Sequence, residues 1–121
     1  MTSQIIVSCP ILPPSANGLH VNVPGKGRVK SSAYTKWRND AVRLFRSQSK
    51  DKIIGPYSLQ IEAGRLIKTK RARDLDNIIK PISDAVVKAG LVEDDSLAEF
   101  VSARWVQGTT GVTILISGVE S

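Results

Sequence analysis

The sequence predicts a small α/β domain of the α+β type. Its expected mixed sheet has about four strands, with two main helices in the order β-α-β-α-β-β. Three observations predict this class. The 121 residues suit one domain, so residues 1–121 are expected to fold together. Several stretches carry β-branched or alternating apolar residues, which is typical of strands. Two others repeat apolar residues at intervals of three and four, which is typical of helices.

The first strand is expected at Gln4–Cys9, which is rich in Ile and Val. The prolines that follow it and Asn17-Gly18 favour a turn that ends the strand. Residues 19–30 contain a proline and two glycines among scattered cations. They are expected to form an irregular basic loop that includes His20.

The first helix is expected to begin near Ser31 or Ser32, either of which can cap it, and to fade around residues 47–50. Its apolar stripe is expected to lie in the core: Tyr34, Trp37, Ala41, Leu44 and Phe45. Gly55-Pro56 then breaks the chain before a strand that alternates from Tyr57 and extends toward Leu66.

The second helix is expected over residues 78–89, where apolar residues recur at helical spacing. Asp76 or Asn77 is expected to cap it, and Gly90 suits the left-handed position that ends it. Pro81 favours a slight irregularity near its start.

An acidic connector, residues 91–96, is expected to follow the second helix. Two final strands, residues 97–107 and 112–118, are joined by Gly108-Thr-Thr-Gly111. A short glycine-bearing join of this kind predicts a hairpin in which the two strands pair directly.

The chain carries a net charge of +6 and a pI near 9.8, which favours nucleic acid or an anionic membrane as partner. No apolar run approaches the roughly 20 residues of a spanning helix, and no signal peptide is evident, so a cytoplasmic protein is expected. One cysteine and one histidine exclude an internal disulfide framework and a Cys/His zinc site. Cys9 is expected to be a small buried residue.

The stretch 68–80 fuses a basic run to two carboxylates. Its cations directly precede Asp74 and Asp76 in the sequence, which suggests that a phosphate backbone is held beside a divalent ion. The residues expected to bind DNA are these cations and those of the basic loop: Lys68, Lys70, Arg71, Arg73, Lys26, Arg28 and Lys30.

Asp74 and Asp76 would diverge in the middle of a helix but point the same way in an extended or helix-entry backbone, so the N-terminus of the second helix is the expected place for both. Lys80 follows Asp76 by four residues and shares its helical face. The acidic run Glu93-Asp94-Asp95 comes after a helix of about 18 Å. It reaches the first two acids only across a subunit boundary, or if the next strand carries it back.

Gathering carboxylates is costly, because two unit charges about 4 Å apart repel by roughly 4 kcal/mol at an effective dielectric of about 20. A hard cation relieves this repulsion, and Mg²⁺ is the usual choice beside phosphates. Such an ion would activate water as nucleophile and stabilise the leaving oxygen, and Lys80 would neutralise charge growing on the phosphate.

Simpler interpretations exist for each residue. Asp74 or Asp76 can serve as a helix cap, and the acidic connector can be a solvated turn. Lys80 and Asp84 can form a surface pair at i,i+4, and residues 68–73 can be a solvated loop. The joint occurrence of these acids and cations nevertheless favours a site that holds a metal ion beside a phosphate.

Two stretches, Arg71-Ala-Arg-Asp-Leu-Asp-Asn-Ile-Ile-Lys80 and Lys88-Ala-Gly-Leu-Val-Glu-Asp-Asp95, resemble the core of the RusA family of Holliday junction resolvases. Pro13-Pro14-Ser-Ala-Asn17 and Ala33-Tyr34 are also similar to it, in the same order along most of the chain. Ala16 departs from the pattern, because an asparagine is expected there, and Pro81 directly follows Lys80.

The resemblance implies a homodimeric, Mg²⁺-dependent endonuclease that acts on four-way DNA junctions, often encoded by phage or prophage genes. It implies that Asp74, Asp76 and Asp95 are the acidic residues that hold the metal, and that Lys80 is the catalytic lysine. The acid that the family carries in the connector matches the second aspartate of the Asp94-Asp95 pair, which is Asp95; Asp94 is the alternative.

The leading hypothesis is therefore a structure-selective endodeoxyribonuclease of DNA recombination and repair, which resolves junctions by paired symmetric cuts. A two-fold dimer would present two equivalent sites to such a junction. Two alternatives remain open: a non-catalytic basic module that binds nucleic acid, and a ribonuclease with similar site chemistry.

Overall fold

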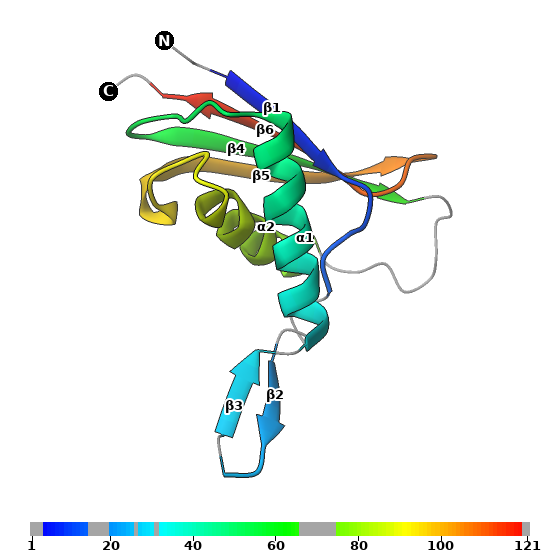
Figure 1. The fold of residues 1–121 in the computed structure, drawn as a ribbon. Helices are drawn as coiled ribbons and strands as arrows, with labels where there is room; N and C mark the ends of the chain where they lie inside the picture. Colours follow the sequence, from blue (N-terminus) through cyan, green and yellow to red (C-terminus); the bar gives the residue numbers. More distant parts are fainter. Residues whose placement is uncertain (1–3, 15–19, 26, 31, 66–74, 120–121) are drawn as a thin grey trace.

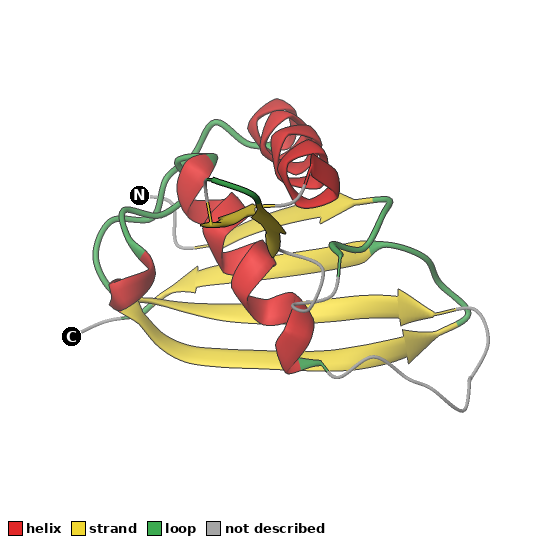
Figure 2. Cartoon of the chain, turned by 90° about the horizontal axis from the view of Figure 1, so that it is seen from below, coloured by secondary structure: helices red, strands yellow, loops and turns green. Residues whose placement is uncertain are grey.

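A four-stranded mixed sheet carries both long helices on one of its faces in the computed structural model (Figures 1 and 2). The structure describes residues 4–14, 20–25, 27–30, 32–65 and 75–119. The predicted α+β class and element order are confirmed. The elements of this layer pair are β1 (Gln4–Cys9), α1 (Ser32–Gln48), β4 (Tyr57–Arg65), α2 (Asp76–Lys88), the short 3-10 helix η2 (Asp95–Leu97), β5 (Ala98–Gln107) and β6 (Val112–Gly118).

The core lies between the sheet and the helices, because alternate residues of the strands point to that face. Leu59 and Ile61 of β4 are almost fully buried there, together with Phe45 of α1 and Ile82 of α2. The predicted core positions of Tyr34, Trp37 and Cys9 are confirmed. None of the described helices has the length and apolar character needed to cross a membrane.

The two ends of α2 differ in how they are capped. The residue before the helix is Leu75, which already has helical dihedrals and makes no side-chain cap, so the predicted cap by Asp76 or Asn77 is wrong. Asp76 instead occupies the first turn, where its charge complements the helix dipole. The C-terminal prediction is confirmed, because Gly90 has a φ of 78° and the Leu91 amide bonds back to the carbonyl of Val86 at 3.2 Å.

The predicted hairpin between the last two strands is wrong. The sheet order is β1-β6-β4-β5, so β4 lies between β5 and β6. The strand β5 pairs with β4 in parallel, whereas β6 pairs with β4 in antiparallel. The loop 108–111 passes over the end of β4, where two backbone hydrogen bonds hold it. The Gly108 amide donates to the Arg65 carbonyl at 2.8 Å, and the Gly64 amide donates to the Gly111 carbonyl at 2.7 Å.

The segment predicted as an irregular loop contains a two-stranded ribbon, β2 (His20–Val23) and β3 (Gly27–Lys30). The expectation that His20 lies in a loop is therefore wrong as well. The glycines and the proline of this segment argued against regular pairing. The two strands nevertheless pair in antiparallel, which satisfies their backbone N–H and C=O groups. Figure 1 shows the ribbon projecting beyond the N-terminal end of α1, away from the sheet.

We expect Gly111→Ala to lower the free energy of unfolding by about 3 kcal/mol or more. A Cβ atom there would lie 2.3 Å from the carbonyl oxygen of Cys9, and the φ of 74° is itself strained for alanine. Gly108→Ala is the matched control, because its φ of 79° is similar but a Cβ would meet nothing within 4 Å. Urea unfolding of both variants measures the difference. Equal losses in the free energy of unfolding would show that the backbone near Cys9 shifts to accommodate the added Cβ atom.

Candidate active site

The first turns of α2 present two of the predicted site residues to solvent. Asp76 and Lys80 are both exposed and lie one helical turn apart. The Nζ atom of Lys80 lies 3.7 Å from Oδ1 of Asp84, so the predicted surface pair at i,i+4 is present. An exposed pair at this distance contributes little stability.

Asp84 connects this segment to α1. The Tyr34 hydroxyl of α1 donates a hydrogen bond to Oδ2 of Asp84 at 3.2 Å. Burial and the negative charge of Asp84 raise the pKa of Tyr34 to about 12, so the phenol stays protonated and keeps donating. Sequence reasoning missed this role of Asp84, although its spacing from Lys80 was visible. The link to Tyr34 depends on packing between two helices.

The three acids of the connector have different partners. The Glu93 carboxylate accepts from the Gly55 amide at 2.8 Å. Asp94 caps η2 and accepts from the amide and hydroxyl of Ser96, and the hydroxyl bond lowers the pKa of Asp94. Asp95 is exposed at the start of η2, and burial together with the negative charge of Asp95 raises the pKa of the Tyr57 hydroxyl. Asp94 therefore has a structural task, which favours Asp95 as a functional acid.

An open hollow of about 530 Å³ lies between the C-terminal half of α2, η2 and α1. Its lining combines acids with cations: Arg38, Asp84, Val87, Lys88, Asp94 and Asp95. The guanidinium of Arg38 also lies 5.9 Å from the centre of the Tyr34 ring. Arg38 is a second residue that sequence reasoning did not assign to the site, although it follows Tyr34 by one helical turn.

The described residues do not bring Asp76 and Asp95 together. Asp76 begins α2, whereas Asp95 lines the same hollow as Asp84 and Lys88, which follow Asp76 by about 12 and 18 Å along the helix axis. Within the described ranges, no three His, Cys, Asp or Glu side chains are placed to hold one metal ion. The carboxylates have the right donor chemistry for Mg²⁺, but one chain's described residues do not complete its coordination shell.

Most of the predicted DNA-binding cations, and one acid, lie outside the described residues: Lys26, Lys68, Lys70, Arg71, Arg73 and Asp74. Arg28 and Lys30 belong to β3 of the projecting ribbon. Another cation, Arg65, is partly buried against an aromatic ring. The Arg65 guanidinium, at the end of β4, lies 5.3 Å from the centre of the Trp105 ring.

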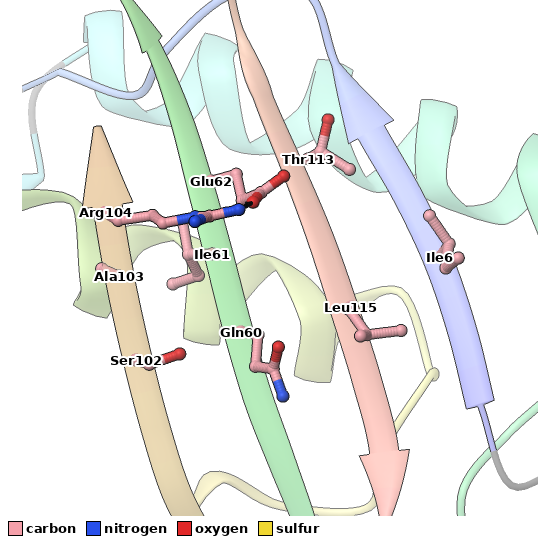
Figure 3. A pocket seen from close by; sticks show the side chains of 9 residues that line it. All are labelled: Ile6, Gln60, Ile61, Glu62, Ser102, Ala103, Arg104, Thr113 and Leu115. Atoms are coloured by element: carbon pink, nitrogen blue, oxygen red, sulfur yellow. Dashed lines mark hydrogen bonds and ion pairs between the residues drawn. The ribbon is translucent and has the colours of Figure 1, made fainter. Parts of the chain in front are cut away.

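A second hollow, of about 320 Å³, lies on the face of the sheet opposite the helices (Figure 3). Figure 3 shows its side chains rising from all four strands, with Arg104 reaching across to Glu62. The Nε atom of Arg104 donates to Glu62 at 2.7 Å, so this cation and this acid neutralise each other. The hollow lacks both the acid cluster and the excess positive charge expected of a nuclease site.

Comparisons with known proteins place the chain in a family. Residues 10–117 match the family model described as "Endodeoxyribonuclease RusA". The "Crossover junction endodeoxyribonuclease RusA" of Aquifex aeolicus (strain VF5) is 28% identical over 112 residues, which are 91% of this chain and 88% of the relative.

A protein of the same description from Enterobacteria phage HK97 is 34% identical over 73 residues, which are 60% of this chain and 58% of the relative. The matched region contains both ends of α2, the acidic connector and three of the four strands of the sheet, whereas β1 precedes it. The predicted resemblance is confirmed, and the chain belongs to the RusA family of endodeoxyribonucleases, which are DNA-cleaving hydrolases.

Proposed function

We propose that this chain, as one endonuclease domain over residues 1–121, resolves four-way DNA junctions by paired symmetric cuts that require Mg²⁺. The observation that carries the proposal is the exposed Asp76 and Lys80 pair at the start of α2, directly after the basic run 68–73, in a chain of this family. The +6 net charge supports salt-dependent attraction to the phosphate backbone.

The proposed site residues divide into three tasks. Asp74, Asp76 and Asp95 hold the divalent ion, whose chemistry when bound is to activate water and to offset charge on the leaving oxygen. Lys80 contacts the scissile phosphate and offsets the negative charge that grows on it. The cations at 68–73 and in the ribbon position the backbone without reading base sequence.

A homodimer supports this division of labour. Asp76 and Asp95 are separated along α2 of one chain, yet both are exposed. A two-fold axis that sets two α2 helices side by side and antiparallel would bring the start of one helix near the connector of the other. Each of the two sites would then combine Asp74, Asp76 and Lys80 of one chain with Asp95 of its partner.

A junction cleavage assay tests the function directly. The protein is incubated with a labelled four-way junction and with a linear duplex of the same sequence, each with Mg²⁺ and with EDTA. We expect Mg²⁺-dependent nicks at symmetric positions in opposite strands of the junction and no cuts in the duplex. Tight junction binding without metal-dependent nicks at any sequence would instead identify a binding module, and cleavage confined to a matched RNA would identify a ribonuclease.

We expect Lys80→Ala to reduce junction cleavage roughly 100-fold while junction affinity changes by less than about threefold, because the ammonium group acts mainly on charge that develops during the reaction. Single-turnover cleavage and a gel-shift titration in EDTA measure the two quantities. Lys36→Ala is the matched control, because Lys36 is an exposed α1 lysine with its own i,i+4 partner, Asp40, at 3.0 Å. Equal losses of cleavage and affinity would make Lys80 a plain DNA contact.

A further inference from the structure

One side of α2 carries three charged residues at intervals of four: Asp76, Lys80 and Asp84. Lys80 can therefore reach a carboxylate in either direction along the helix. An acid that precedes a lysine by four residues is the better partner, and helical side chains lean toward the N-terminus, so Asp76 is the expected choice. The structure shows the opposite pairing. The Lys80 ammonium lies 3.7 Å from Asp84, and no described cation forms an ion pair with Asp76.

The carboxylate of Asp84 is held in place from a second helix. Tyr34 of α1 is almost fully buried, and its hydroxyl donates to Oδ2 of Asp84 at 3.2 Å. The other oxygen, Oδ1, is the one that faces the Lys80 ammonium. The side chain of Asp84 is 31% exposed and that of Lys80 is 73% exposed, so the carboxylate is the fixed member of the pair and the ammonium is the mobile one.

We propose that Asp84 is a positioning residue that holds the Lys80 ammonium away from Asp76. This step rests on the proposed function, in which Asp76 uses its negative charge to bind the divalent ion and Lys80 uses its positive charge on the scissile phosphate. A direct pair between Asp76 and Lys80 would neutralise both groups before DNA arrives. The pair with Asp84 is exposed and weak, so an incoming phosphate can displace the carboxylate and take the ammonium.

A purely structural role of Asp84 is the competing explanation, because its bond to Tyr34 joins α2 to α1. The structure offers a matched control for that role. Arg46 of α1 makes a second link between the same two helices, since its guanidinium donates to the carbonyl of Lys88 at 3.0 Å and to that of Ala89 at 3.4 Å. Arg46→Ala therefore removes one link between α1 and the end of α2 and leaves the surroundings of Lys80 intact.

Asp84→Asn keeps an oxygen for the Tyr34 hydroxyl and removes the charge that holds Lys80. We expect single-turnover junction cleavage to fall roughly 30-fold, with junction affinity in EDTA within about threefold of the wild type. In a Lys80→Ala background, the same substitution is expected to cause no further loss, because no ammonium remains to be positioned. Arg46→Ala is expected to cleave within about twofold of the wild type. Equal losses from Asp84→Asn with and without Lys80 would overturn the proposal.

The position of Lys80 is a readout that does not depend on cleavage. In a crystal structure of Asp84→Asn grown in EDTA, we expect the Nζ atom of Lys80 to lie within about 4 Å of an Asp76 carboxylate oxygen. In Arg46→Ala it is expected to stay beside Asp84. A Lys80 ammonium that stays away from Asp76 in Asp84→Asn would refute the positioning role and leave the endonuclease intact. A Lys80→Ala variant with normal cleavage would count against the proposed function, whereas the crystal structure would still decide what Asp84 does to Lys80.

Discussion

Asp76→Asn is expected to reduce junction cleavage at least about 1,000-fold while junction affinity in EDTA stays within about threefold of the wild type. The substitution keeps the shape of the side chain and removes one negative charge that the proposed Mg²⁺ site requires. Affinity is expected to persist because it arises from the cations of the basic run and the ribbon, which are untouched. Cleavage of a labelled junction and a gel-shift titration measure the two effects.

Asp40→Asn is the control for this variant. Asp40 is a partly exposed α1 carboxylate that pairs with Lys36 at 3.0 Å and with Arg43 at 3.5 Å, far from the start of α2 in the sequence. Loss of the Asp40 negative charge is expected to leave junction cleavage unchanged. If Asp76→Asn abolished binding in a folded protein, the proposed separation of metal binding from DNA binding would fail.

Two inactive variants are expected to restore each other when mixed. If each site takes Asp76 from one chain and Asp95 from its partner, a heterodimer of Asp76→Asn and Asp95→Asn has one intact site and one doubly altered site. Random exchange makes half of the dimers heterodimers, so roughly a quarter of the sites regain function. We expect the mixture to nick one strand of the junction in each binding event.

A second mixture controls for this rescue. Asp76 and Lys80 lie on the same α2, so a heterodimer of Asp76→Asn and Lys80→Ala contains no intact site and is expected to stay inactive. Chain exchange is verified by mass spectrometry of differently tagged copies. Absence of rescue despite verified exchange would show that each site is built from a single chain.

The local parts of this molecule could be predicted from the sequence. The helix that begins with Asp76 and ends before Gly90 has its own period and its own stop signal, and the structure reproduces both. The buried stripe with Tyr34 and Trp37 follows the same logic, since helical periodicity reports which side faces the core. The proximity of Asp76 and Lys80 needs only the helix geometry.

Relations between distant segments could not be predicted in the same way. A glycine-bearing join between two strands looks the same whether the strands pair directly or flank a third, so the position of β4 between β5 and β6 was missed. The placement of Asp95 beside Asp84 depends on how η2 packs on α2. The edge strand β1 is joined to α1 by the side-chain amide of Gln48, which accepts from the Ser8 amide and donates to the Ser8 carbonyl, and the sequence position of this surface glutamine carries no such signal.

The place of β6 in the sheet has a consequence for biosynthesis. Among the described strands this one is synthesised after all the others, yet it bonds to the first of them, β1, and to β4 on its other side. Until residues 112–118 leave the ribosome, β1 has no neighbour in the sheet, and Ile5 and Val7 have no complete core to enter. Completion of the sheet must therefore wait for residues 112–118, and folding is expected to be slow because the strand pairings join residues far apart in sequence. A ribosome stall before Val112 would hold a nascent chain with an unpaired apolar strand, which is a substrate for chaperones or proteases.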